Sequence, residues 1–502
     1  MKKNPTVAII AIAFFAVLAI PLQSAAQEHS GAHKRHPRYK LVDLGTFGGP
    51  ESFLYGWDHS HFAHVFNNEG TLTGWAETPE RDPSSDPNFC WDLDCFVAHA
   101  YRWQNGRMRD LGTLQGGASS DSRWISENGL IAGDSENGEL DPLNPGLLQI
   151  RAVLWKGGQI IELGSLEGGY DSLAHAVNSR GQVVGTSLTT VSDPDSIMGA
   201  IYGWPQQTRG FLWENGSMRD LGTLGSGTNA MALMLNESGQ VAGYSYTGPD
   251  PSSGCPFPLV TASFLWQKGT MLDLGTLGGT CTLVSDLNNR GQVVGVSNLA
   301  GDETRHPFFW QQGVIRDLST LGGEGAAIAV NEAGIAAGWS NPEGNAVTRP
   351  TMWKDHHVID LGTVGSDPCG IATALNSQSM VVGFSGDCNF DDLNAFLWEP
   401  GRSIVDLNDF VPPNSDLHLR VAWAINDRGE IAGLGRFPDG VHHAFVLVPC
   451  GDGVPTDHDG CRGPRDQPDA TAGKLQRPTL QPGFQTLSGP RRLQAFHPWH
   501  QR

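Results

Sequence analysis

Short apolar runs separated by turn-forming residues recur eight times along this chain, in the same order each time. The third copy shows the pattern, with runs at residues 174–178, 181–187, 210–213 and 218–222. Short runs rich in β-branched and aromatic residues, bounded by Gly and Asn, are typical of β-strands. Each copy therefore predicts four short strands, which we name A to D in chain order.

Two segments of nearly constant length predict how these strands pair. The turn residue between strands A and B lies seven residues before a strand B glycine in every copy. A strand C tryptophan lies seven residues before the acidic residue of strand D, or eight from Trp398 to Asp406. Most of these segments contain a glycine where a tight turn needs positive φ, so A–B and C–D are predicted to be β-hairpins. The A–B turn residues are Asn67, Ser126, Asn178, Asn236, Asn288, Asn331, Asn376 and Asn426.

Eight four-stranded units of this length predict an all-β fold, a β-propeller with eight blades. The chain opens with a spare strand D at residues 39–45, and its last unit has no strand D of its own. Placing the first strand beside the last strand C would close the ring and remove an exposed edge. A β-solenoid is the competing fold, and the hairpin turns at fixed spacing argue against it.

The two ends of the chain differ from the repeats. Residues 1–26 resemble a cleaved signal peptide, with Lys2 and Lys3 before an apolar run that is too short to span a bilayer. Residues 27–38 are a linker, 39–449 the propeller, and 450–502 a Pro- and Arg-containing tail that we expect to be disordered. We therefore expect a secreted protein, or one of the periplasm or cell envelope, with no stable membrane span after cleavage.

Charge and composition narrow the classes of partner. The formal net charge is −20, and 64 of the 502 residues are glycine. Nucleic acids and anionic lipids reward clustered Lys and Arg, so we expect neither as the main partner. We expect a monomer that binds an extracellular glycan or protein.

The connections between the hairpins vary in length, and they predict where binding occurs. From the strand B glycine to the strand C tryptophan or its equivalent, the spacing is 29, 22, 28 and 23 residues in units 1–4, but only 15, 15, 15 and 14 in units 5–8. Antiparallel pairing places all B–C and D–A connections on one face, where loops on a rigid scaffold usually carry function. Five aromatic residues of the long connections are predicted to be exposed and to bind the partner: Trp75, Phe89, Trp91, Tyr202 and Trp204.

Eight cysteines in an exported protein favour disulfides over free thiols or zinc. Six of them lie on the face that carries the variable connections. Proximity within the repeats predicts the pairs Cys90–Cys95, Cys255–Cys281, Cys369–Cys388 and Cys450–Cys461.

Residues of the right type for metal binding or catalysis are present, but no pattern selects a set. His59, His61 and His64 include two that share a strand face and one that points away, so we expect no metal site. The strand D aspartate recurs too often to be catalytic, and we expect it to bond the backbone or a neighbouring blade. The carboxylates of the first long connection cannot be reduced to a catalytic pair: Glu77, Glu80, Asp82, Asp86, Asp92 and Asp94. We assign no catalytic residue and no cofactor.

The repeated phrases resemble the extracellular HAF repeat family of bacterial exported proteins. The His-Ala-Phe triplet stands at His443, Ala444 and Phe445, and Asp-Leu-Gly-Thr-Leu-Gly-Gly at residues 273–279. Departures from the pattern occur at Ser126, His356 and Ser379, and in the long cysteine-bearing insertions. The resemblance covers residues 40–449 and implies no established activity. We expect a non-enzymatic binding protein; an extracellular polysaccharide hydrolase or lyase, and a purely structural surface protein, are the alternatives.

Overall fold

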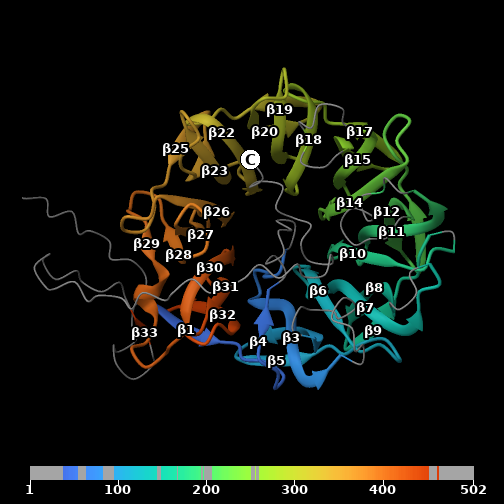
Figure 1. Ribbon diagram of the computed structural model, residues 1–502, viewed down its shortest axis with the longest axis horizontal. Helices are drawn as coiled ribbons and strands as arrows, with labels where there is room; N and C mark the ends of the chain where they lie inside the picture. Colours follow the sequence, from blue (N-terminus) through green and yellow to red (C-terminus); the bar gives the residue numbers. More distant parts are fainter. Residues whose placement is uncertain are drawn as a thin grey trace, which may run out of the picture. The chain divides into compact units, whose positions relative to one another are not determined.

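The computed structural model describes residues 38–54, 64–82, 95–143, 148–166, 168–193, 196, 206–249, 255, 259–450 and 461–462. These residues form eight antiparallel sheets that follow one another around a ring, with strand A of each sheet innermost (Figure 1). The predicted eight-bladed β-propeller is therefore confirmed. In the described part of the chain, no helix is both long and apolar enough to cross a bilayer.

Each blade uses its strands in the order A to D. Blades 1 to 4 contain β2 (Ser52–Phe53), β3 (Thr71–Arg81), β4 (Phe96–Gln104), β5 (Arg107–Asp110); β6 (Ser120–Ile125), β7 (Ile131–Leu140), β8 (Leu148–Lys156), β9 (Gln159–Glu162); β10 (Ser172–Val177), β11 (Val183–Ser192), β12 (Gln206–Glu214), β13 (Ser217–Asp220); β14 (Asn229–Leu235), β15 (Val241–Pro249), β16 (Leu259–Gln267) and β17 (Thr270–Asp273).

Blades 5 to 8 contain β18 (Gly278–Leu287), β19 (Val293–Leu299), β20 (Arg305–Gln311), β21 (Val314–Asp317); β22 (Gly322–Val330), β23 (Ala336–Pro342), β24 (Arg349–Lys354), β25 (His357–Asp360); β26 (Cys369–Leu375), β27 (Val381–Gly386), β28 (Leu393–Trp398), β29 (Val405–Asp406); β30 (His418–Ile425), β31 (Ile431–Arg436), β32 (His442–Pro449) and β1 (Tyr39–Asp43). The short helix η1 (Leu407–Phe410) follows β29, and β33 (Cys461–Arg462) pairs with β1.

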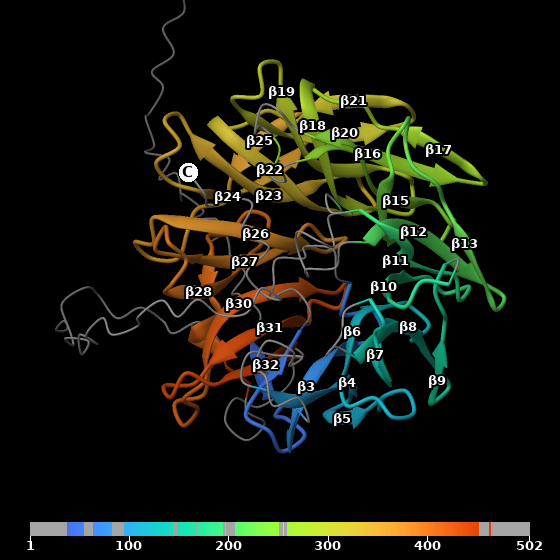
Figure 2. The ribbon, with the colours of Figure 1, turned by 45° about the vertical axis from the view of Figure 1, so that its right-hand side comes forward.

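The first strand closes the ring as predicted. Strand β1 pairs antiparallel with β32, from Tyr39 opposite Pro449 to Asp43 opposite Phe445. It therefore supplies strand D of the last blade, and the blades at the two ends of the sequence lie side by side (Figures 1 and 2).

A bulge at one position shapes the innermost strands. In blades 2 to 8 the A–B register shifts three residues before the turn residue, so that one strand A residue has no partner on strand B. A bulge bends the strand and increases its twist. The bulged residues are Arg123, His175, Leu233, Ser285, Ile328, Thr373 and Trp423.

The strand B glycine is required because two neighbours approach it closely. A Cβ built on Gly295 would lie 2.0 Å from the carbonyl oxygen of Leu283 and 2.9 Å from the ring of Phe308. Phe308 is fully buried, and it is the aromatic residue two positions before the strand C tryptophan. The repeated glycine and the repeated aromatic residue therefore form one packing unit.

The turn asparagine joins each blade to the next. The side-chain amide of Asn331 donates to the carbonyl of Asn376 in the following blade at 3.1 Å. Its carbonyl oxygen accepts from the backbone N–H groups of Ala333 and Ile335 in its own turn. The same inter-blade bond is made by Asn67, Asn178, Asn236, Asn288, Asn376 and Asn426. We call these bonds the asparagine latches.

Inter-blade bonds of this kind are also present in blade 2, which lacks the turn asparagine, and at the junction of the last blade with the first. In blade 2, Ser126 replaces the asparagine, and Asn128 donates instead to the carbonyl of Ser179 at 2.7 Å. The amide of Asn426 donates to the carbonyl of Asn67 and so joins the last blade to the first. Every junction around the ring therefore carries a side-chain bond at this level.

Two other departures keep the backbone conformation of the residue that they replace. The turn glycines have positive φ, as at Gly181 with φ +79° and Gly216 with φ +81°. His356 and Ser379 stand in place of such glycines and have φ +65° and +61°. Residues with a Cβ are strained in this left-handed region, so His356 and Ser379 adopt an unfavourable backbone conformation in these turns.

Candidate functional site

One face of the propeller carries hairpins of two sizes. In blades 1 to 4, strands B and C are 9 to 11 residues long, whereas in blades 5 to 8 they are 6 to 8 residues long. The insertions of units 1 to 4 therefore lengthen the B–C hairpins before any loop begins. We call this surface, formed by the B–C ends of blades 1 to 4 and the adjacent D–A connections, the hairpin face.

The predicted aromatic residues are placed only in part. Trp75 lies in β3, not in a loop, and is partly buried with its ring centroid 4.3 Å from that of Phe53. The sequence placed it in a loop because the extension of β3 to Arg81 has no separate signal. Phe89, Trp91, Tyr202 and Trp204 lie outside the described residues.

Exposed aliphatic side chains occur at the ends of two neighbouring long hairpins. Leu140 and Leu143 of blade 2 are 65% and 41% exposed, and Val191 of blade 3 is 53% exposed. The B strands that lead to them are β7 and β11, which belong to blades that are neighbours in the ring (Figure 1). These side chains make the described ends of the two hairpins a candidate interaction surface.

The paired ends of β3 and β4 in blade 1 present a cation over an aromatic ring. The guanidinium carbon of Arg81, at the end of β3, lies 3.8 Å from the ring centroid of Phe96 in β4. Arg81 is exposed, and Phe96 is partly buried. This contact stabilises the pairing of the two strand ends.

Each of three described insertions begins with an aspartate, and sequence reasoning named Asp82 but missed that this aspartate recurs. Asp82, Asp141 and Asp193 each stand eight residues after the strand B glycine of their blade, and a proline follows each of them. The signal was present in the sequence as a repeated Asp-Pro pair at the start of each long connection. Aligning the insertions as well as the strands would have found it.

In blade 3, this aspartate bonds the first strand of the next blade. The carboxylate of Asp193 accepts from the side-chain amide of Asn229 at 2.7 Å and from the hydroxyl of Thr228 at 3.3 Å. The amide oxygen of Asn229 accepts in turn from the backbone N–H of Thr208 at 2.7 Å. The long hairpin is thus tied to blade 4.

In blade 2, the equivalent contact joins two carboxyl groups. Asp141 and Asp171 are both 2% exposed, and their side chains are hydrogen-bonded to each other. Asp171 Oδ1 accepts from the backbone N–H of Ile150 at 2.9 Å. Burial raises the pKa of Asp171 to about 7. The backbone bond from Ile150 lowers this pKa, and the nearby charge of Asp141 raises it further.

A second buried charged group lies between blades 2 and 3, nearer to the centre of the ring. Arg123 Nη2 lies 2.6 Å from Asp134 Oδ2, and Asp134 Oδ1 accepts from the backbone N–H of Ala174 at 2.8 Å. Burial raises the pKa of Asp134 well above its usual range, against the charge of Arg123. Burial, then Arg123, lowers the pKa of His175. The group joins strands of two blades, and we interpret it as structural.

The repeated strand D aspartate bonds the backbone, as expected, and it also pairs with a strand C side chain of its own blade. Asp110 accepts from the backbone N–H of Gly112 at 2.7 Å and pairs with His99 on strand C at 2.8 Å. The hydrogen bond to Asp110 raises the pKa of His99, although burial opposes it. Equivalent pairs join Asp43 to His443, Asp317 to His306, Asp220 to Arg209, and Asp360 to Arg349.

The histidines considered for a metal are mostly outside the described residues. Of the three, only His64 is described; its Nδ1 is 3.0 Å from the carbonyl oxygen of Ile125, and its ring packs on Trp124. Among the described side chains, no group of three or more His, Cys, Asp or Glu residues could hold a metal ion.

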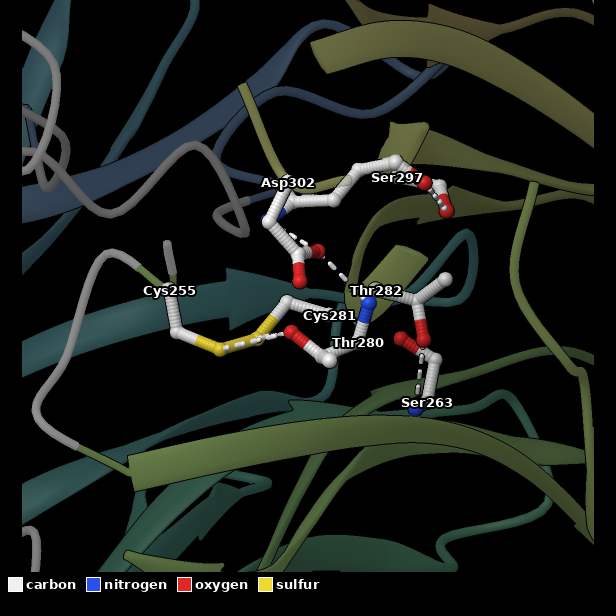
Figure 3. The surroundings of a disulfide bond; sticks show 8 residues. Cys255, Ser263, Thr280, Cys281, Thr282, Ser297 and Asp302 are labelled. Atoms are coloured by element: carbon white, nitrogen blue, oxygen red, sulfur yellow. Dashed lines mark hydrogen bonds between the residues drawn. A yellow bond between two sulfur atoms is a disulfide. The ribbon is translucent and has the colours of Figure 1, made fainter. Parts of the chain in front are cut away.

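Two of the predicted disulfides are present. Cys255 pairs with Cys281 across the blade 4 insertion and the following D–A connection (Figure 3). Cys369 pairs with Cys388 in blade 7. Cys95 and Cys450 are also disulfide-bonded, but the predicted pairs Cys90–Cys95 and Cys450–Cys461 involve side chains outside the described part and stay predictions.

The surroundings of Cys255 show how a disulfide anchors the hairpin face. Thr280 Oγ1 lies 3.8 Å from the sulfur of Cys255, and its backbone N–H donates to Asp302 Oδ1 at 2.7 Å (Figure 3). Thr282 Oγ1 accepts from the backbone N–H of Ser263 at 3.0 Å. The insertion of blade 4 is thus covalently attached to the first strand of blade 5.

Comparison with known proteins finds similar solved structures only. No family model and no curated protein matches this chain. Similar structures include the β-propeller domain of the Trilobed protease from Pyrococcus furiosus, 10% identical over 70% of this chain and 100% of that chain, with a TM-score of 0.41. Dipeptidyl peptidase 4 from Porphyromonas gingivalis is 8% identical over 78% of this chain and 61% of that chain, with a TM-score of 0.43. The GH93 alpha-L-arabinofuranosidase of Fusarium graminearum is 12% identical over 83% of this chain and 98% of that chain, with a TM-score of 0.29. At these values the likeness carries no inference about activity.

Proposed function

We propose that this protein is an exported, non-enzymatic propeller of the HAF repeat type that binds a partner through its hairpin face. The observation that carries the proposal is the long hairpins of blades 1 to 4, two of which end in exposed aliphatic side chains. A rigid ring that presents lengthened hairpins on one half of one face provides a broad surface of fixed shape. The disulfides at Cys255–Cys281 and Cys369–Cys388 suit an oxidising compartment outside the cytoplasm.

The described side chains favour a protein partner over a glycan. Aliphatic groups such as Leu140 and Val191 contribute to protein interfaces by burial, whereas sugar rings are held best by open aromatic surfaces. Trp75, the described member of the predicted aromatic set, is partly buried against Phe53. A glycan partner remains the second outcome of the experiment.

The experiment compares two pairs of exposed aliphatic residues in the full exported chain. Leu140→Ser with Val191→Ser removes the apolar ends of the hairpin face. Leu272→Ser with Val314→Ser removes side chains of 46% and 50% exposure from the outer strands β17 and β21 and serves as the matched control. Each variant is measured against a glycan array and an array of envelope and extracellular proteins, with release of products followed in parallel.

We expect the wild-type protein and the control to bind the same protein, and the hairpin-face variant to bind at least tenfold more weakly. Burying two aliphatic side chains stabilises a complex by about 1.5–3 kcal/mol each, and tenfold corresponds to about 1.4 kcal/mol. Equal loss in the two variants would contradict the hairpin face as the binding surface. Turnover of any glycan would instead support the hydrolase or lyase alternative.

A further inference from the structure

Two buried aspartic acids from neighbouring blades meet where β7, the first strand of the blade 2 hairpin, ends. Asp141 follows the end of β7, and Asp171 precedes the start of β10. Their carboxyl groups are hydrogen-bonded, and each residue is 2% exposed. Two ionised carboxylates have no proton to donate, so this bond exists only while one carboxyl keeps its proton. The proton is therefore part of the contact between the blades.

The backbone provides few other bonds for this pair. Asp171 Oδ1 accepts from the N–H of Ile150, and Asp141 Oδ1 accepts from the N–H of Leu143 at 2.8 Å. These two backbone bonds persist when the carboxyls ionise. The bond between Asp141 and Asp171, which links blade 2 to blade 3, does not persist. Loss of the proton thus leaves two negative charges in contact in a buried place, which is unfavourable.

The charged groups on the elements packed around the pair do not replace the proton. The charge of Arg151 on β8 lowers the pKa of Asp171, but burial outweighs it. The Arg151 guanidinium is bonded to Gln149 at 2.8 Å and to Ser165 at 3.0 Å, and it is paired with Glu162 on β9 at 3.3 Å. On β7, Glu136 accepts from the backbone N–H groups of Ala118 and Ser119, which precede β6 in the same blade, and Glu139 is exposed. On β10, burial and Arg123 disfavour the charged form of His175.

The next junction contains the same contact without the titratable pair. Asp193 occupies the position of Asp141, and Asn229 occupies the position of Asp171, since Asn229 Oδ1 accepts from the N–H of Thr208 as Asp171 Oδ1 does from Ile150. The amide of Asn229 donates to Asp193 at 2.7 Å. The amide donor of Asn229 does not titrate, so this bond loses no proton from its donor when the pH rises from 5.5 to 8.5.

We propose that the Asp141–Asp171 pair is a pH-sensitive latch, which holds the long hairpin of blade 2 against blade 3 while it keeps a proton and releases the hairpin when the proton is lost. The pKa of Asp171, about 7, lies above the value of about 3.9 for an unfolded chain. The stabilisation is therefore complete below about pH 4, declines as the pH rises towards 7, and is absent above that range. The exposed Leu140 and Leu143 belong to the segment that is released.

This latch does not depend on the proposed binding function. Only an effect of pH on partner binding would rest on that function, because it would require the partner to contact the blade 2 hairpin. The test below therefore measures the hairpin itself, so that failure of the latch and failure of the binding proposal are separate results.

Hydrogen exchange of the full exported protein tests the latch at pH 5.5 and 8.5, corrected for the intrinsic effect of pH on exchange. The peptides to follow cover residues 131–150 of blade 2 and 183–210 of blade 3. In the wild type, we expect protection of the blade 2 peptide to fall by about tenfold or more at pH 8.5, since each pH unit above the pKa weakens the latch by a factor of ten. The blade 3 peptide should change little.

Two reciprocal variants provide the controls. Asp171→Asn gives blade 2 the chemistry of the next junction and should abolish the fall in protection. Asn229→Asp places a carboxyl beside Asp193 and should create a fall of the same kind in blade 3. A fall that persists in Asp171→Asn overturns the proposal, as does an Asn229→Asp variant whose blade 3 peptide stays insensitive to pH. If Asp171→Asn does not fold, the Asn229→Asp variant decides alone, together with the loss of a protonated-carboxyl infrared band from the wild type between the two pH values.

Discussion

Replacing Asn331 by alanine tests whether the asparagine latches hold the ring together. The substitution removes three hydrogen bonds: the inter-blade donation to Asn376, and the bonds from the N–H groups of Ala333 and Ile335. Asn331 is 7% exposed, so water does not readily replace the hydrogen bonds that its side chain makes. Blade 6 keeps its strands and its core, which isolates the effect of the latch.

The expected cost follows from where each of these partners lies. The inter-blade bond contributes about 1 kcal/mol, and the N–H of Ile335, a residue that is 8% exposed, costs about 2 kcal/mol when it loses its acceptor. Ala333 is exposed, so water satisfies its N–H at little cost. The free energy of unfolding should therefore fall by about 3 kcal/mol, measured by urea unfolding with tryptophan fluorescence.

Blade 2 supplies the compensating control. There Ser126 Oγ accepts from the N–H of Leu130 at 2.9 Å, and Asn128 makes the inter-blade bond. The double variant Asn331→Ser with Ala333→Asn reproduces this arrangement in blade 6 and should recover about 2 kcal/mol of the loss. A loss below about 1 kcal/mol in Asn331→Ala, or a double variant no more stable than the alanine variant, would refute the reasoning.

Three further predictions concern other parts of the ring. Ser379→Gly should raise the free energy of unfolding by about 0.5–1 kcal/mol, because glycine adopts its φ of +61° without strain; no gain in urea unfolding would show that the turn is unstrained. Deleting residues 38–46 removes β1 from β32 and should lower the melting temperature and expose the edge of β32 to exchange, unlike deletion of residues 463–502. Burial lowers the pKa of His443, but the hydrogen bond to Asp43 outweighs burial, and the pKa is raised overall. The stability that protonated His443 contributes to the fold is therefore complete below about pH 6.5 and is lost as the pH rises through the pKa of the folded protein. His443→Gln should abolish that part of the decline in melting temperature above pH 6.5, and an unchanged decline would contradict the assignment.

The repeat spacing predicted the fold because the turns are local. A tight turn such as the one at Gly181 needs the same residues wherever it occurs, so a constant interval between asparagine and glycine reveals the hairpin. The missing strand D of the last unit likewise predicted the pairing of β1 with β32. Both inferences depend on backbone geometry that a short stretch of sequence determines.

The contacts between blades were harder to predict because they join residues far apart in sequence. Asn331 was interpreted as a turn residue, and its bond to the next blade is visible only when the blades are in place. Trp75 was assigned to a loop because the extra length of β3 depends on its pairing with β4. The Asp141–Asp171 contact depends on burial at a junction of two blades, which no local pattern reports.

The asparagine latches also bear on how such a chain evolves. Each turn carries both the donor for the following blade and the acceptor for the preceding one, so a duplicated repeat brings its own means of attachment on both sides. The B–C connections emerge at the opposite end of the strands from these turns. Insertions can therefore accumulate and diversify in single copies of the repeat without disturbing how that copy joins its neighbours.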